Sequence, residues 1–424
     1  MDHEAANSFR IHGRGGARAV RWLLFSLNVA NSSQAGPSLA PHAPTVIEAQ
    51  AAGGPAWDGR HDVSAFLQAA VDAGSISGAV VHLPAGKWQL AKPVIMRGQV
   101  ILEGDARGTI LAPAANNSSD PLLLEFPVNA ANVVIQDITF DGGGIDFTSQ
   151  NPVLKATAGT NLVFAAVTVQ NSRGIGLLLQ GGMKSSGVRN SRFLNLGNHW
   201  KTTLNKVDRI QGLVFCCGQG NVDNFATGNY FKDIGLDALQ IGDQSHFCAA
   251  SNVFDLANNQ INLVPAPDYP AGIFILHSAE AQVFGNLIHS AAGNGIDAPG
   301  LQNSYLSNNV VSGCGGCGIG LFLGYDGTRQ TRGVLVFGNT ISNNVHWSLS
   351  SFVGGITIAG GAPSDIEISA NTVTDTQARK TQAYGIQVRE NTKVSGLKID
   401  RRNRLGGNRL GEMIGADYEP ERKR

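Results

Sequence analysis

Two aspartates directly follow Gly-aliphatic pairs, in the segments "GLDALQI" (235–241) and "GIDAPG" (295–300). At that place, six similar segments carry an uncharged residue: "GIGLLL" at 174, "GLVFCC" at 212, "GIFILH" at 272, "GIGLFL" at 318, "GITIAG" at 355 and "GIQVRE" at 385. Two carboxylates at a fixed spacing can act as general acid and general base, for example in the hydrolysis of a glycosidic bond. Asp237 and Asp297 are therefore the leading candidates for a catalytic pair.

Three further polar residues lie near this pair in the sequence. Asp243 follows "LQIG" and is a third catalytic candidate, although an aspartate at a strand end also commonly caps a turn. His246 lies three residues later, and His277 ends the intervening strand "GIFIL". Both histidines are candidates for substrate contacts, and a hydrogen-bonded structural histidine is the alternative interpretation of His277.

Aromatic and basic residues gather in the segments that interrupt the pattern, at 196–206, 264–271, 323–332 and 344–352. Aromatic faces can stack on the C–H surface of a sugar, and arginine can bind hydroxyls or carboxylates. Packing against the rest of the chain is the alternative use of the same side chains. The candidates for substrate binding in these segments are Trp200, Tyr269, Tyr325, Arg329, Arg332 and Trp347.

These residues must be positioned by a repeat. The glycines of the Gly-aliphatic segments stand at 174, 212, 235, 272, 295, 318, 355 and 385, with a shortest step of 23 residues. Asn-led strands alternate with them, such as "GNLI" at 285 and "GNTI" at 338. Short strands at this period, with occasional insertions, predict a parallel β-helix. Leucine-rich repeats share the period, but the chain lacks their L-x-x-L-x-L pattern.

Successive side chains of a strand point to opposite faces, so the residue after each of these glycines is expected inside the helix. One internal ladder should then contain Leu236, Ile273, Ile296 and Ile319. The next residue should point outward, which places Asp237 and Asp297 in one outer file, two coils apart. Two strand spacings of about 4.8 Å put their backbones roughly 10 Å apart. That distance is compatible with the carboxyl pair of an inverting glycoside hydrolase.

The chain is expected to have four segments. Residues 1–44 are interpreted as a leader and linker outside the fold, and residues 413–424 as a charged tail. Residues 45–95 include "DVSAFLQAAVDAG" (62–74), which predicts an amphipathic helix with Asp62 as its N-cap and Gly74 as its stop. Residues 96–412 are expected to form the β-helix.

Composition and charge exclude several functions. Lys+Arg and Asp+Glu are both 32, so the formal net charge is zero and nucleic acid is not an expected partner. No apolar run is long enough for a transmembrane helix, so no membrane partner is expected. Arginines, a short apolar run and small residues between positions 14 and 36 resemble a secretory signal and predict a secreted or periplasmic protein.

The five cysteines form an odd set, which argues against a fully paired disulfide framework. Cys314 and Cys317 have C-x-x-C spacing, but no second such pair accompanies them. We therefore expect them to bind no metal and to be small side chains stacked in a β coil. No cofactor is expected.

The segments "DVSAFLQAAVDAG" (62–74) and "GAVVHLPAGKWQL" (78–90) resemble the cap helix and first coil of the pectate-lyase-like (pectin lyase fold) superfamily. The Asn- and Gly-rich coils up to about residue 410 continue the resemblance. It implies an all-β, right-handed, single-stranded parallel β-helix with a short N-terminal cap helix. "GDQSH" at 242 only partly matches the polygalacturonase motifs, and "DAPG" at 297 lacks the histidine of the alginate-type epimerase motif. The clustered acidic calcium ligands of pectate lyases are not visible, which disfavours a calcium-dependent lyase.

The sequence therefore predicts a carbohydrate-active enzyme, of glycoside hydrolase or transglycosylase type, that uses Asp237 and Asp297 as an acid/base pair. The first alternative is a uronate-polysaccharide lyase or epimerase, in which Arg329, Arg332 or His277 would matter more. The second alternative is a non-catalytic glycan-binding shaft of tailspike or adhesin type. The expected partner is a carbohydrate. A homotrimer is compatible with the resemblance, because trimers are common among related helices.

Overall fold

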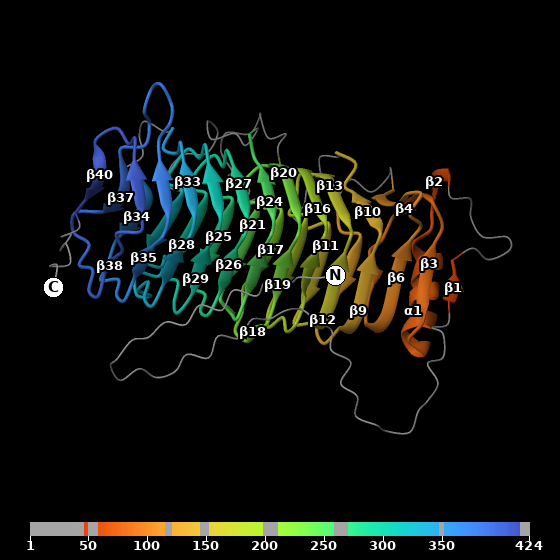
Figure 1. Ribbon diagram of the computed structural model, residues 1–424. Coiled ribbons are helices and arrows are strands. Elements are labelled where there is room, and N and C mark those ends of the chain that lie inside the picture. The colour runs from red at the N-terminus through yellow and green to blue at the C-terminus, as the bar shows by residue number, and fades with distance from the viewer. Residues whose placement is uncertain are drawn as a thin grey trace, which may run out of the picture. The chain divides into compact units, whose positions relative to one another are not determined.

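The computed structural model describes residues 46–49, 58–114, 121–144, 152–197, 211–257, 270–346 and 352–415. Their strands form three long parallel sheets, two of 13 strands and one of 12, together with a two-stranded ladder. Consecutive strands of the chain go to the three sheets in turn, so each coil of the chain adds one strand to each sheet (Figure 1). This arrangement is the parallel β-helix that the repeat predicts.

The first sheet consists of β1 (Val46–Glu48), β3 (Val80–Leu83), β6 (Gly98–Gly104), β9 (Ala131–Gln136), β12 (Thr160–Ala165), β15 (Gly187–Arg189), β19 (Phe225–Thr227), β23 (Cys248–Ala250), β26 (Gln282–Phe284), β29 (Tyr305–Ser307), β32 (Leu335–Phe337), β35 (Glu367–Ser369) and β38 (Lys398–Ile399). The second consists of β2 (Asp58–Asp62), β4 (Gly86–Leu90), β7 (Thr109–Pro113), β10 (Ile138–Asp141), β13 (Thr168–Ser172), β16 (Arg192–Leu196), β20 (Tyr230–Ile234), β24 (Val253–Asp255), β27 (Leu287–His289), β30 (Val310–Ser312), β33 (Thr340–Ser342), β36 (Thr372–Thr374) and β39 (Arg404–Gly406). The third consists of β5 (Val94–Ile95), β8 (Leu124–Phe126), β11 (Leu154–Thr157), β14 (Leu177–Gln180), β17 (Leu213–Cys216), β21 (Leu239–Gly242), β25 (Ile273–Leu276), β28 (Ile296–Pro299), β31 (Ile319–Phe322), β34 (Gly354–Ala359), β37 (Tyr384–Val388) and β40 (Gly411–Ile414). The two-stranded ladder pairs β18 (Asn221–Val222) with β22 (Gln244–Ser245).

The predicted helix is present as α1 (Ser64–Ser77), although both of its expected ends differ by a few residues. Asp62 Oδ1 accepts a hydrogen bond from the backbone N–H of Ser64, two residues along the chain. Gly74 does not end the helix. A Cβ atom there would come within 2.7 Å of Val81, so this glycine allows close packing on the first sheet. The helix ends at Gly78, which has the left-handed conformation that glycine adopts most easily.

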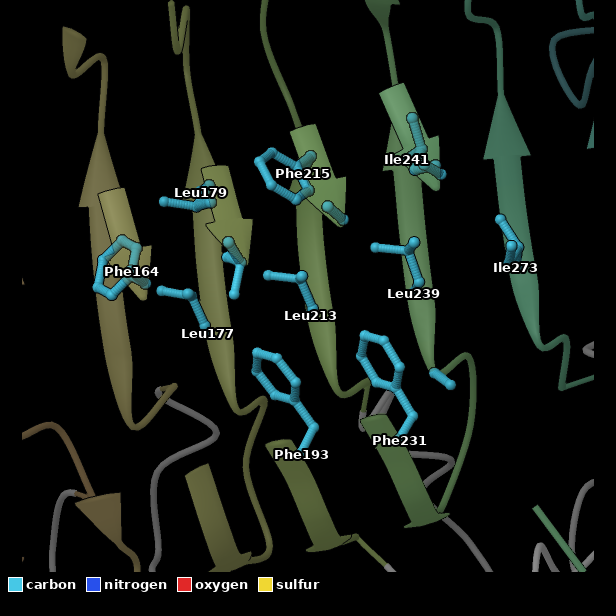
Figure 2. Packing of buried hydrophobic residues seen from close by; sticks show 14 of the residues in the cluster. Phe164, Leu177, Leu179, Phe193, Leu213, Phe215, Phe231, Leu239, Ile241 and Ile273 are labelled. Carbon is cyan, nitrogen blue, oxygen red and sulfur yellow. The ribbon is translucent and has the colours of Figure 1, made fainter. Parts of the chain in front are cut away.

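Apolar side chains of the third sheet form ladders inside the coils (Figure 2). Ile273 pairs with Ile296, and Ile296 with Ile319, which confirms three members of the predicted internal ladder. The prediction for Leu236 is wrong, because Leu239 pairs with Ile273. Starting the strand at Leu236 would have turned Gln240 into the apolar interior, where a buried amide without a partner is costly.

A line of buried asparagines explains the Asn-led strands. Each side-chain amide donates to the side-chain oxygen of the asparagine in the next coil, at 2.9–3.0 Å. The line contains Asn229, Asn252, Asn286, Asn309, Asn339, Asn371 and Asn403. These bonds satisfy polar groups at the corner between the first and second sheets, and therefore fix how the coils stack.

Candidate active site

The register of the third sheet separates the two aspartates on which the predicted pair depended. Asp297 pairs with Phe274, and Phe274 pairs with Gln240, so Gln240 occupies the position that was predicted for Asp237. Asp237 lies three residues before it. Three residue steps and two strand spacings put the two backbones roughly 14 Å apart. The shared offset is therefore wrong, and the spacing no longer matches an inverting carboxyl pair of about 6.5–9.5 Å.

Asp237 is buried, with 8 % of its surface exposed, instead of lying on an open outer face. Its Oδ1 accepts a hydrogen bond of 2.8 Å from the backbone N–H of Ala271, in the next coil. The carboxylate thus satisfies a backbone donor at the point where the chain enters β25. This contact gives Asp237 a structural task.

Replacing Asp237 by Ala should lower the free energy of unfolding by about 1–3 kcal/mol, because the Ala271 N–H would lose its acceptor inside the protein. Asp237→Asn keeps an acceptor oxygen and should cost less. Urea unfolding of the two variants measures the difference. Equal stability of Asp237→Ala and the unmodified protein would show that this hydrogen bond contributes nothing.

Asp297 is also buried, with 5 % of its surface exposed. Its Oδ2 accepts a 2.9 Å hydrogen bond from Asn294 Nδ2, and its Oδ1 has no hydrogen-bond partner among the described residues. Burial raises the pKa of this carboxyl from 3.8 to about 7, and the Asn294 bond opposes the shift only in part. The outer face of the third sheet thus holds one carboxyl group that is still partly protonated near pH 7.

Side chains that carry chemistry instead meet at the corner that follows the strands of the third sheet. The backbone is left-handed at this corner. Gly181, after β14, has a φ of 75°, and Gly300, after β28, has a φ of 68°. Between them, Cys217, Asp243 and His277 take the same conformation, with φ of 62°, 52° and 51°. Residues with a side chain adopt this conformation less readily than glycine. The corner therefore presents three functional side chains in consecutive coils.

Asp243, His277, Asp326 and Arg329 form a cluster at this corner, which we call the corner cluster. Arg329 Nη1 lies 3.0 Å from Asp243 Oδ1, and Arg329 Nε lies 3.5 Å from Asp326 Oδ2. His277 lies between the same two carboxylates, with Nδ1 4.0 Å from Asp243 and Nε2 3.7 Å from Asp326. Arg329 also donates to the backbone carbonyl of His277, at 3.3 Å. One guanidinium and one imidazole are thus shared by two carboxylates.

The imidazole of His277 is enclosed by glycines. A Cβ atom at Gly324 would come within 2.6 Å of Nε2, and one at Gly300 within 3.0 Å of Cδ2. Nε2 is buried and has no hydrogen-bond partner among the described residues. Burial lowers the pKa of His277, Arg329 lowers it further, and the carboxylates of Asp326 and Asp243 oppose this change. The ring is consequently neutral at neutral pH and can accept a proton.

Asp326 was not predicted from the sequence. It belongs to the turn "YDGT", and its carboxylate accepts hydrogen bonds from the backbone N–H groups of Thr328 and Arg329 at 2.9 and 3.0 Å. The bond from Arg329 and the bond from Thr328 lower its pKa to about 2. An Asp-Gly pair is typical of a turn, but only the folded chain places this turn beside His277.

The other predicted binding residues lie in different surroundings. Tyr325 packs against Phe274, with ring centroids 5.6 Å apart and the ring planes tilted by 31°. His246 lies at a different corner, where it contacts Asp223 at 3.5 Å and Glu280. The backbone of Arg332 forms single bridges with Gln302 and Ser364. Trp200, Tyr269 and Trp347 lie outside the described residues.

The cysteines include a feature that the sequence analysis missed. Cys216 and Cys217, which are neighbours in the chain, form a disulfide. Cys314 and Cys317 are buried free thiols, and burial raises the pKa of Cys314 to about 12. Within the described parts of the chain, no group of three or more His, Cys, Asp or Glu residues is arranged to hold a metal ion. The described ranges also contain no helix that is long and apolar enough to cross a membrane.

Two family profiles match the chain. The family described as "Right handed beta helix region" matches residues 212–403, and the family described as "Rhamnogalacturonase A/epimerase, pectate lyase-like" matches residues 53–245. A search of curated protein sequences finds no significant match.

Solved structures share the fold at low sequence identity. The A-module of the Azotobacter vinelandii mannuronan C-5 epimerase AlgE4 is 18 % identical, with a TM-score of 0.55, and the match covers 87 % of this chain and 96 % of that one. A mutant tailspike protein of E. coli bacteriophage HK620, in complex with a hexasaccharide, is 16 % identical with a TM-score of 0.61, covering 83 % and 64 %. The Agl-KA catalytic domain is 13 % identical with a TM-score of 0.57, covering 90 % and 69 %.

These matches confirm a right-handed parallel β-helix and the fold class that the first coil resembles. The two profiles together span residues 53–403, and the chain has the right-handed parallel β-helix fold of pectate-lyase-like proteins. At such identities the likeness establishes the fold, and the fold hosts several activities. The activity must therefore be argued from the chemistry of the corner cluster.

Proposed function

We propose that the protein is a carbohydrate-active enzyme that acts on a uronate-containing polysaccharide by proton abstraction, as a lyase or an epimerase. In this proposal His277 is the base that takes the proton at C5, next to the uronate carboxyl group. The electron pair left at C5 then either forms a C4–C5 double bond as the C4–O bond breaks and the leaving oxygen takes up a proton, or takes a proton back at C5 from the opposite face. Arg329 binds that carboxylate and stabilises the negative charge that develops on it. Asp243 and Asp326 are positioning residues, because they hold the imidazole and the guanidinium from both sides.

One observation carries the proposal: the corner cluster places a neutral imidazole and a guanidinium together. Hydrolysis would need a protonated carboxylic acid at the reacting bond. Neither cluster carboxylate is suited to that role, since both contact Arg329 and the pKa of Asp326 is about 2. Proton abstraction requires a base and a cation, and the corner cluster supplies both.

Substrate must displace part of the loop over the base. Gly324 lies against Nε2, and Arg329 is engaged with two carboxylates of the protein itself. A uronate carboxylate entering the site can replace one of these partners while Gly324 moves away from the ring. Loop movement of this kind commonly completes a catalytic site only when substrate is bound.

Product analysis tests the proposal. The protein is incubated with polygalacturonate, alginate and a neutral dextran in D₂O. Ultraviolet absorbance detects unsaturated products, NMR detects hydrogen exchange at C5, and a reducing-end assay detects hydrolysis. We expect unsaturated products or exchange at C5 with at least one uronate polymer and no reaction with dextran. New reducing ends without unsaturation or exchange would refute proton abstraction.

Glycoside hydrolysis is the second candidate, because Asp297 can be protonated near neutral pH, as a general acid requires. Its burial and its distance from the predicted partner Asp237 count against it. Glycan binding without any turnover would instead support the tailspike-like shaft.

We also propose that the protein is exported. The Cys216–Cys217 disulfide supports this location, since disulfides persist mainly in oxidising compartments. The homotrimer remains a prediction.

A further inference from the structure

The Cys216–Cys217 disulfide lies at the end of β17, beside the corner cluster. Cys216 points outward from the third sheet with 7 % of its surface exposed, and Cys217 is exposed at the left-handed corner position. Cys217, Asp243 and His277 occupy this corner in consecutive coils, at spacings of about 4.8 Å. The sulfur pair is therefore a direct neighbour of the groups to which we assign the reaction.

Glycines flank the disulfide at the corner and in the following coil, whereas in the preceding coil Cys216 pairs with Gln180. In the preceding coil, Gly181 packs closely against Gly218. A Cβ atom on Gly218 would lie 2.8 Å from the Cα atom of Gly181. In the following coil, the residue next to Cys216 is Gly242, whose Cβ position would lie 3.4 Å from Cys216 Cβ. No side chain of these three glycines can shield the sulfur atoms from a ligand.

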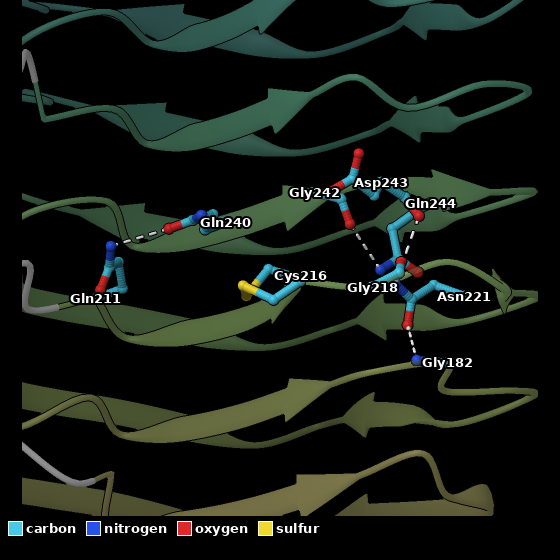
Figure 3. The surroundings of a disulfide bond; sticks show 10 residues. Gly182, Gln211, Cys216, Gly218, Asn221, Gln240, Gly242, Asp243 and Gln244 are labelled. Carbon is cyan, nitrogen blue, oxygen red and sulfur yellow. Dashed lines mark hydrogen bonds between the residues drawn. A yellow bond between two sulfur atoms is a disulfide. The ribbon is translucent and has the colours of Figure 1, made fainter. Parts of the chain in front are cut away.

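Side-chain amides lie on the other side of the disulfide. Gln211 Nε2 donates a 2.9 Å hydrogen bond to Gln240 Oε1. Gln211 is 5 % exposed, and its own Oε1 has no hydrogen-bond partner among the described residues. Figure 3 shows the disulfide between this amide pair and Asp243 on the third sheet. The sulfur surface is thus bordered by a buried amide pair on one side and by the Asp243 carboxylate on the other.

We propose that the Cys216–Cys217 disulfide is the floor of a pyranose-binding subsite, next to the reacting uronate. A pyranose ring has an apolar C–H face and hydroxyl groups around its edge. The C–H face would pack on the polarizable sulfur atoms, as apolar groups pack on methionine sulfur. The edge hydroxyls on the side of the corner cluster would donate to the carboxylate of Asp243. This subsite rests on the proposed function only for the identity of the neighbouring sugar.

Its role would be to bind the polymer and set its register across the corner cluster. Polar groups that converge on an apolar floor fix the orientation of a ligand. The subsite should therefore contribute to affinity for every polymer that the protein binds, whether or not the adjacent unit is converted. Binding and turnover can consequently be measured separately.

Gly242→Leu tests the subsite without touching a cysteine. The Cβ position makes only ordinary contacts at 3.4 Å or more, so the substitution should be tolerated and should place an isobutyl group over the sulfur atoms. Gly406→Leu is the matched control, because Gly406 ends strand β39 of the second sheet and its Cβ position has no atom within 4 Å. Circular dichroism and thermal melting verify that both variants fold.

Affinity electrophoresis in gels that contain polygalacturonate or alginate measures the dissociation constant. We expect Gly242→Leu to bind about tenfold or more weakly, equivalent to about 1.4 kcal/mol, and Gly406→Leu to bind like the unmodified protein. A folded Gly242→Leu variant with unchanged affinity would overturn the subsite. Alkylation without prior reduction gives a second test. If mass spectrometry then finds Cys216 and Cys217 labelled, the two residues are free thiols and the subsite is overturned.

The same gels distinguish failure of the subsite from failure of the proposed function. If no polymer is converted but Gly242→Leu still weakens binding, the subsite stands and the proposed reaction falls. If polymer is converted and Gly242→Leu changes neither affinity nor KM, the reaction stands and the subsite is refuted.

Discussion

His277→Asn is expected to lower kcat by roughly 10²–10⁴-fold, the usual contribution of a general base. Asparagine tolerates the left-handed backbone that His277 adopts, so the change should remove the base without breaking the corner. Steady-state kinetics on the polymer identified by the product assay measures the loss. In the unmodified enzyme, kcat/KM should fall on the acid side of its pH profile with an apparent pKa below the ordinary histidine value of about 6.5. The reason is that burial lowers the pKa of His277.

His246→Asn is the control for this substitution. His246 has the same kind of backbone, with φ of 55°, and also contacts two carboxylates, but at a different corner. We expect it to keep nearly full turnover. If His246→Asn loses as much activity as His277→Asn, the reaction centre includes the other corner. If His277→Asn retains turnover, His277 is not the base.

Asp297→Asn should stabilise the protein, and the gain should grow with pH. The pKa of the folded-state carboxyl is raised from 3.8 to about 7, so between these values the folded state binds more protons than the unfolded state. Stability of the unmodified protein must then fall as pH rises through this window, and asparagine removes the dependence. The gain should be small near pH 4 and level off above about pH 7, at up to about 4 kcal/mol.

Urea unfolding at a series of pH values measures this gain. Asp255→Asn, at a half-buried position on the second sheet, is the matched control for the substitution itself. A loss of stability in Asp297→Asn at high pH would mean that the Asp297 carboxylate has a cationic partner. Loss of turnover with normal stability would instead favour the hydrolytic candidate, in which Asp297 is the general acid.

The sequence by itself determined the fold, because its signals are local and repeated. The glycine steps, the Asn-led strands and the alternation of apolar residues each predicted stacked coils, and Ile273, Ile296 and Ile319 do form one ladder. From Asn229 to Asn403, each asparagine of the line donates to the one in the next coil, so the same local pattern also fixes the stacking there. Repetition makes such a prediction robust, since one misplaced coil leaves the others unchanged.

The register of single strands was less well determined. "GLDALQI" contains two possible strand starts, and the glycine pattern favoured the one that begins with Leu236. The structure uses Leu239, since that start keeps Gln240 out of the apolar interior. Testing both starts for a buried amide would have identified the correct one and shown that Asp237 and Asp297 do not share a file.

Only the tertiary structure assembled the candidate site. Asp243, His277 and Arg329 were candidates from the sequence, but their 86-residue span gave no reason to place Arg329 beside Asp243. The loop that carries Asp326 and Arg329 folds back over a corner two coils earlier, and this path depends on contacts between distant residues. The exposure of a side chain also depends on contacts between distant residues. Alternation placed Asp297 outward correctly, yet burial on that face changes its pKa, and burial is a property of the whole fold.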